Sequence, residues 1–238
     1  MKRTITCSLA FLLLLTSLFT PDVHASMNSK FKTIDEPYIF PYSNYSEQGE
    51  EWRKLTQEEK IKARTVPEEI LYGMTPKALA ETILYYPDCF EVLLSDTIQE
   101  GYDHMGKKEV FQFAYKTKGV AQEILKIYKQ PATDYMKEMY SRSVFITHLS
   151  FTMAQWVILD QLTEAELLSL VEIAREKMEF AKANKDLYTL NRADELVLLR
   201  VLERLYGFEK MLEFLYIEGK DLQSDDIEQF IRTGNYIW

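Results

Sequence analysis

Glu100, Asp103 and His104 lie close together in the chain and are the side chains best suited to acid–base or metal chemistry. If this segment is helical, Glu100 and His104 share one face, because residues four apart are neighbours on a helix. A carboxylate beside an imidazole can bind a divalent metal, with Glu100 and His104 as ligands, or can orient the ring as a base, as Asp103 would. The alternative is a solvated surface, and Gly101 weakens the helix that the first hypothesis requires.

Cys89 is the remaining candidate for catalysis. A thiolate activated by His104 would be a nucleophile, provided that the fold brings the two side chains together. A cysteine hydrolase also needs a group that orients the histidine and a site for the oxyanion, and neither is visible in the sequence. The alternatives for Cys89 are a small buried apolar residue and a reactive or intermolecular thiol.

Tyr85, Tyr86 and Tyr102 are the candidate binding residues in a chain that contains 15 tyrosines. Exposed aromatic rings bury a large area at low entropic cost, so they mark surfaces that bind proteins or sugars. Rings buried between short helices are the alternative interpretation.

Most catalytic motifs are absent from the sequence, including a phosphate-binding loop, a nucleophile elbow, a zinc-binding H-E-x-x-H helix and a C-x-x-C pair. The sequence therefore predicts no cofactor. His148 lies within Ser143–Leu159, a stretch without any charged residue. We expect it to be a core histidine that is hydrogen-bonded to a neighbour.

The first 25 residues have the three-part pattern of a secretory signal peptide. Lys2 and Arg3 precede an uncharged apolar stretch from Ile5 to Phe19, and the small residue Ala25 follows. This pattern predicts cleavage after Ala25 and a secreted or cell-envelope protein. A retained membrane anchor is the alternative, but the apolar stretch is near the short limit for crossing a bilayer.

The mature chain would be acidic. The whole chain has a formal charge of −9, and losing Lys2, Arg3 and Asp22 with the signal peptide makes it −10. Such a charge repels phosphate backbones and anionic lipid surfaces, so we expect no nucleic-acid partner. A protein or a cell-wall component is the expected partner.

The spacing of apolar residues and of helix caps predicts an all-α fold. Residues 26–46 contain prolines and no helical period, which indicates an extended lead-in with aromatics such as Phe40 along the domain surface. Capping boxes at Thr56 with Glu59 and at Thr163 with Glu166 begin two helices. We expect a single domain over residues 47–238, either an irregular multi-helix bundle or a short stack of helical hairpins, with about nine or ten helices.

One long helix is expected from about Thr133 to Leu162, because no proline or glycine interrupts that stretch. Its uncharged part would be buried on most sides. A transmembrane span is the alternative, but His148, Gln155 and several hydroxyl groups are costly in lipid.

Residues Trp52–Pro87 resemble a group of uncharacterised exported bacterial proteins, mostly Gram-positive. The shared string is W-x-x-L-T-x-E-E, then P-E-x-x-L, M-T and Y-P, and here it starts at Trp52, Pro67, Met74 and Tyr86. The resemblance implies an exported helical fold and no particular activity. It carries over no functional residue.

Two main hypotheses for function follow. The first is a non-catalytic binding or protein-interaction domain that acts outside the cytoplasmic membrane. The second is a hydrolase or metal-dependent enzyme centred on His104, which requires the candidate residues to converge in one cleft. A third hypothesis is an acidic inhibitor that blocks a basic enzyme.

Overall fold

The computed structural model describes residues 31–42, 45–131, 142–184, 192–217 and 224–235. The regular structure of these residues is helical, and the β-type pairing among them is an isolated bridge between Ile34 and Met74. The predicted all-α class is therefore confirmed. The predicted signal peptide and its cleavage position lie outside the described residues.

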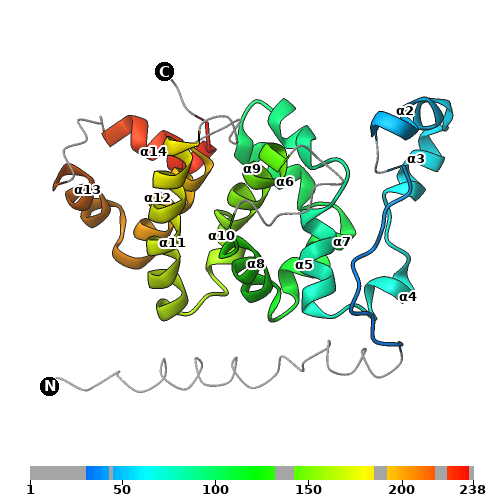
Figure 1. Cartoon of the computed structure of the whole chain (residues 1–238), viewed down its shortest axis with the longest axis horizontal. Helices are drawn as coiled ribbons and strands as arrows, with labels where there is room; N and C mark the ends of the chain where they lie inside the picture. Colours follow the sequence, from blue (N-terminus) through cyan, green and yellow to red (C-terminus); the bar gives the residue numbers. More distant parts are fainter. Residues whose placement is uncertain (1–30, 43–44, 132–141, 185–191, 218–223, 236–238) are drawn as a thin grey trace, which may run out of the picture.

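The helices form an irregular multi-helix bundle and follow one another along the long axis of the molecule, from α2–α4 at one end to α13 and α14 at the other (Figure 1). More helices are present in the described part than the nine or ten expected, in part because α4 and α10 are short helices of four residues each. The elements are α2 (Tyr45–Lys54), α3 (Gln57–Ala63), α4 (Glu68–Leu71), α5 (Pro76–Leu84), the 3₁₀ helix η1 (Cys89–Leu94), α6 (Ile98–Met105), α7 (Glu109–Lys116), α8 (Val120–Tyr128), α9 (Arg142–Met153), α10 (Trp156–Leu159), α11 (Glu164–Ala183), α12 (Ala193–Tyr206), α13 (Phe208–Ile217) and α14 (Ser224–Thr233).

Both predicted capping boxes are present. The Thr56 hydroxyl accepts from the amide of Glu59, and the Glu59 carboxylate accepts from the amide of Thr56 at 2.8 Å. Thr163 and Glu166 repeat this arrangement at the start of α11. Each box satisfies amides that a helix start leaves without partners, so the two helices begin where the sequence predicts.

The expected long helix is interrupted, which corrects the prediction that it continues to Leu162. Helix α9 ends at Met153, and Gln155 has an extended backbone before α10 begins at Trp156. A tertiary contact stabilises this break: the carbonyl of Ala154 accepts a hydrogen bond from Arg200 of α12 at 3.1 Å. The part of the expected helix before α9 lies outside the described residues.

Two helices share the centre of the bundle. Helix α9 is buried from Phe145 onward, as its uncharged sequence predicts. Helix α12 is buried from Ala193 to Leu202 and packs against α9 and α11, although it contains Asp194, Glu195 and Arg200. The burial of this part of α12 is accompanied by polar contacts of Asp194, Glu195 and Arg200.

The lead-in is extended in its described part, residues 31–42, and lies beside α4 and α5. The amide of Ile34 donates to the Gly73 carbonyl at 2.8 Å, and the amide of Tyr38 donates to the Thr82 hydroxyl at 2.9 Å. Phe40 is only 2% exposed and packs edge-on against Tyr86, with ring centroids 4.9 Å apart. The expectation that this aromatic lies along the surface is therefore wrong, since its ring completes the core.

The alternative to a buried α9 is a transmembrane span, which requires a long and apolar helix. None of the helices in the described ranges combines the length and the apolar character needed to cross a bilayer.

Candidate interaction site

A small pocket lies where η1, α6 and α9 meet. Its walls include Cys89, Val92 and Leu93 from η1, Tyr102 from α6, and Thr147 and His148 from α9. The cavity volume is about 10 Å³, which is space for one water-sized group. The pocket therefore suits the tip of a ligand group and is too small to enclose a whole substrate.

Gly101 sets the close approach of η1 and α6 that forms one wall of the pocket. A Cβ atom at this position would lie 2.7 Å from both the Cα atom and the carbonyl oxygen of Val92. Two backbones can approach this closely only where one residue lacks a side chain. The glycine that weakens the predicted helix is therefore required for packing.

A buried hydrogen-bond network forms the floor of the pocket. The Tyr102 hydroxyl lies 2.7 Å from Nδ1 of His148 and 3.1 Å from the Thr152 hydroxyl. Nε2 of His148 lies 3.4 Å from the carbonyl oxygen of Ile83. A carbonyl can only accept, so we assign the ring proton to Nε2, and Nδ1 then accepts from Tyr102.

The environment of His148 confirms that it is a hydrogen-bonded core histidine. Burial lowers the pKa of His148 to about 4, so the ring is neutral near pH 7. Burial also raises the pKa of Tyr102 well above its ordinary value, which keeps the hydroxyl protonated as a donor. Both imidazole nitrogens have protein partners, so His148 does not act as a base toward Cys89, although both residues line the pocket.

Thr147 differs from its polar neighbours in the pocket. Its side chain is 3% exposed, and its hydroxyl has no hydrogen-bond partner among the described residues. A buried hydroxyl without a partner costs about 1–3 kcal/mol relative to one that is hydrogen-bonded. The pocket therefore contains a polar group that a ligand atom could satisfy.

Two adjacent leucines lie exposed at this pocket. Leu93 lines the pocket and is 41% exposed, and Leu94 is 77% exposed. A single exposed apolar residue is common on protein surfaces, but adjacent ones beside a partly apolar pocket are a feature of binding sites. No motif or spacing in the sequence points to Leu93, Leu94 or Thr147 as site residues.

The catalytic and metal candidates do not converge in this structure. Glu100, Asp103 and His104 are exposed on α6, and the Asp103 carboxylate accepts from the side-chain amide of Gln99 at 2.9 Å. Cys89 is 3% exposed and lies in the pocket, whose walls do not include His104. Within the described ranges, no group of three or more His, Cys, Asp or Glu side chains is arranged to hold a metal ion.

The candidate binding tyrosines are largely internal. Tyr86 and Tyr102 are buried, and the Tyr86 hydroxyl donates to the Arg64 carbonyl at 3.2 Å. Tyr85 is half-buried and stacks on Phe145, with ring centroids 5.0 Å apart. Tyr86 and Tyr102 therefore correspond to the buried-ring alternative, and Tyr102 meets a ligand only through the pocket.

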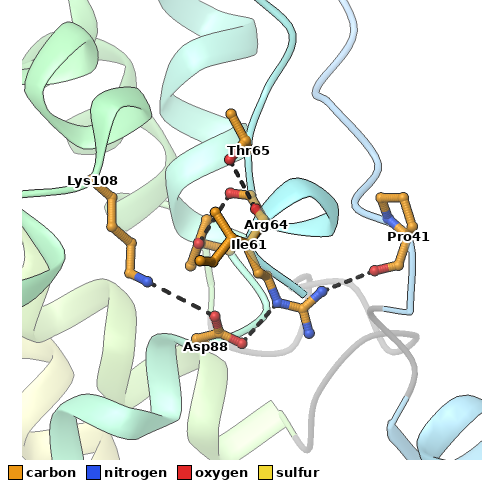
Figure 2. A network of polar contacts seen from close by, with 7 residues as sticks. Pro41, Ile61, Arg64, Thr65, Asp88 and Lys108 are labelled. Atoms are coloured by element: carbon orange, nitrogen blue, oxygen red, sulfur yellow. Dashed lines mark hydrogen bonds and ion pairs between the residues drawn. The ribbon is translucent and has the colours of Figure 1, made fainter. Parts of the chain in front are cut away.

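A buried ion pair beside the pocket attaches the lead-in to the bundle. Nε of Arg64 donates to the Asp88 carboxylate at 2.9 Å, and the same guanidinium donates to the Pro41 carbonyl at 2.9 Å (Figure 2). Lys108 reaches the other carboxylate oxygen at 4.0 Å. The guanidinium also lies 4.0 Å from the ring centroid of Trp52. This cluster is satisfied within the protein, so its role is structural.

Asp194 and Arg200 of α12 form two further buried polar clusters. The Asp194 carboxylate accepts from Tyr128 at 2.6 Å and from Ser150 at 2.7 Å, and burial raises the pKa of this carboxyl group. Arg200 donates from all three side-chain nitrogens, to the carbonyls of Ile231 and Ala154 and to the Gln99 side chain. Both clusters join helices that are distant in the sequence.

No protein-family model, curated protein or solved structure shows significant similarity to this chain.

Proposed function

We propose that this chain is an exported binding domain that acts outside the cytoplasmic membrane and docks a protein partner on the η1 surface. The η1 surface is defined as Leu93 and Leu94 together with the pocket that Leu93 and Thr147 line. The observation that carries the proposal is the exposure of two adjacent leucines, of which Leu93 lines the same pocket as a buried Thr147 hydroxyl that has no described partner.

The physical reason is that docking would remove two costs at once. Covering Leu93 and Leu94 withdraws apolar area from water, which stabilises a complex by about 25 cal/mol per Å² of that area. A polar atom of the partner that reaches Thr147 would also give its hydroxyl a hydrogen bond. Both effects lower the free energy of the complex relative to the η1 surface in water.

Export is supported by the first 25 residues, where Lys2 and Arg3 precede the apolar stretch and Ala25 follows it. The resemblance of Trp52–Pro87 to exported bacterial proteins agrees with this part of the proposal. The exposed positions of Glu100, Asp103 and His104 give no specific support to the enzyme hypothesis.

Cross-linked capture with site variants tests the proposed function. The purified protein would be incubated with envelope and secreted fractions of its host, and cross-linked species would be identified by mass spectrometry. We expect one saturable protein partner, captured by the unmodified protein and about tenfold less by Leu94→Ser, which corresponds to about 1.4 kcal/mol.

Leu168→Ser is the matched control, because Leu168 is 43% exposed on α11 and lies away from η1 in the sequence. Its capture should equal that of the unmodified protein. Equal losses from both variants, or no saturable partner at all, would contradict the proposal.

A further inference from the structure

We propose that the partner presents a cationic amphipathic segment to the η1 surface, with apolar side chains on Leu93 and Leu94 and Lys or Arg groups toward an acidic rim. The acidic rim is defined as Glu91, Asp96, Glu100 and Asp103. This inference rests on the proposed function, because it names the chemical class of the partner at the same site.

The charge of the segment that contains η1 and α6 is one-sided along the sequence, although Lys108 and Arg64 lie near Glu91 in the fold. Between Asp88 and Gly106 the sequence contains five acidic residues and no lysine or arginine. Asp88 is buried and paired with Arg64, whereas the four residues of the acidic rim are exposed. Two of them, Glu91 and Asp96, flank the leucine pair within two residues on either side. Their carboxylates therefore lie close to any group that covers the leucines.

Some exposed carboxylates elsewhere in the molecule have cationic neighbours on their own helices. Glu123 pairs with Lys126 on α8, and Glu179 pairs with Lys182 on α11, with N–O distances of 2.5 and 2.6 Å. The acidic rim forms no comparable ion pair within the described residues. Lys108 and Arg64 offset part of this field at Glu91, and Arg200 offsets part of it at Asp103. The remaining field would attract a cationic partner over about a Debye length.

The pocket adds an observation that does not depend on charge. The Thr147 hydroxyl is buried and has no described partner, and the space beside it fits one water-sized group. Two other buried polar atoms also lack described partners, on Tyr115 and Glu203, but neither residue lines this pocket. Thr147 therefore indicates where a ligand atom would enter.

The exposed leucines and the acidic rim together favour an amphipathic segment over a polycation or a purely apolar segment. A polycation would satisfy the acidic rim but leave Leu93 and Leu94 in water. An apolar segment would cover the leucines but place nothing opposite the four carboxylates. Only a segment with one apolar and one cationic side uses both features, as helical peptides do when they bind an apolar surface.

Peptide binding measured by fluorescence anisotropy tests the inference. The probe is a labelled 18-residue Leu/Lys peptide with its leucines on one helical face. Its two comparison peptides are a scrambled sequence of the same composition and a Leu/Glu counterpart. We expect the amphipathic Leu/Lys peptide to bind at least about tenfold more tightly than either one, and more weakly as salt rises.

Variants of the protein locate the binding. Leu94→Ser and the double variant Glu91→Gln with Asp96→Asn should each weaken binding about tenfold, and the double variant should flatten the salt dependence. Thr147→Val should weaken binding about threefold without loss of thermal stability. The matched controls on α11, Leu168→Ser and Glu172→Gln with Glu176→Gln, should leave the affinity unchanged.

The outcomes separate this inference from the proposed function. Equal losses from the η1 and α11 variants would mean attraction by net charge alone, which overturns the inference. Equal binding of the Leu/Glu peptide would overturn the cationic class. If no peptide binds while capture of a host partner still depends on Leu94, the inference fails and the proposed function stands. If neither depends on Leu94, both fail.

Discussion

Arg200 and Thr147 are both buried polar side chains in the centre of the molecule, yet their surroundings are opposite. Arg200 is completely buried, and each of its three nitrogens donates to an oxygen of another element. Thr147 is almost as buried, and its single hydroxyl has no partner among the described residues. The hydrogen bonds of Arg200 complete the fold. The Thr147 hydroxyl, in contrast, can still form a hydrogen bond with a ligand atom.

Burial alone therefore does not distinguish a structural residue from a functional one. What distinguishes them is whether the polar group is satisfied within the protein. The Arg64–Asp88 and Asp194 clusters belong with Arg200, because their groups are hydrogen-bonded across helices. The η1 surface, like Thr147, has groups that the described part of the protein leaves uncovered or without a hydrogen bond.

Replacement of Arg200 should have the largest effect. Arg200→Met leaves the carbonyls of Ile231 and Ala154 and the Gln99 side chain without their donor, so we expect a loss of about 4 kcal/mol in the free energy of unfolding. Urea denaturation measures it. Arg204→Met is the control on the same helix, because Arg204 forms an exposed ion pair with Asp160 and its loss should cost less than about 1 kcal/mol. Similar values for the two variants would contradict the structural role of Arg200.

His148 should make stability depend on pH. Its pKa is about 4 in the folded state and near 6.5 in the unfolded chain, so the unfolded state binds more protons below pH 6.5. Its contribution, about 3 kcal/mol, is complete above pH 6.5 and is lost as the pH falls through about 4. Denaturation midpoints measured at pH 7, 5.5 and 4 test this.

The control for this pH dependence is the second histidine of the predicted mature chain. His148→Gln should reduce the fall in stability between pH 6.5 and 4, whereas His104→Gln should keep it, because His104 is exposed. Identical pH profiles for the two variants would show that carboxylates account for the whole effect.

Replacement of Thr147 should have the smallest effect on stability, and it tests whether a buried hydroxyl without a partner differs from a hydrogen-bonded one. Thr147→Val keeps the shape and the β-branching of the side chain but removes the hydroxyl, so we expect a gain of about 1 kcal/mol in stability. Thr152→Val makes the same change in α9 where the hydroxyl bonds to Tyr102 at 3.1 Å, and it should lose about 1 kcal/mol. Thermal denaturation of the pair should give shifts of opposite sign, and shifts of the same sign would contradict the difference between the two hydroxyls.

The features that the sequence predicts well are local ones. The capping boxes at Thr56 and Thr163 need only residues three apart, so their spacing determines them. His148 is surrounded by apolar residues in the sequence, and a polar side chain in such a helix must find a partner. In both cases the residues that determine the structure are close neighbours in the sequence.

The features that the sequence does not predict depend on contacts between distant residues. The break at Gln155 contains no proline or glycine, and it is stabilised by Arg200, which lies 46 residues beyond Ala154. Phe40 is buried because Tyr86 packs against it, not because of its own surroundings in the lead-in. Local propensity therefore gives way to tertiary packing at these positions.

The candidate site cannot be predicted from the sequence for a similar reason. Cys89, Tyr102 and His148 each stand out by residue type, and the structure brings all three to one pocket. Thr147 and Leu94 do not stand out, because the absence of a hydrogen-bond partner and the exposure of a leucine are properties of the folded surface. No spacing of residues along the chain reports either property.

The contacts of Arg200 also have a consequence for the order in which the chain can fold. They join Arg200 to Gln99, 101 residues earlier, and to Ile231, which lies 31 residues later in the helix nearest the C-terminus. During synthesis this cluster cannot close until α14 has been made, so the contact of Arg200 with Ile231 forms only after α6 and α12 are already present. For a protein that we propose is exported, this order would delay the final packing of α6, α12 and α14 until all three helices have been synthesised.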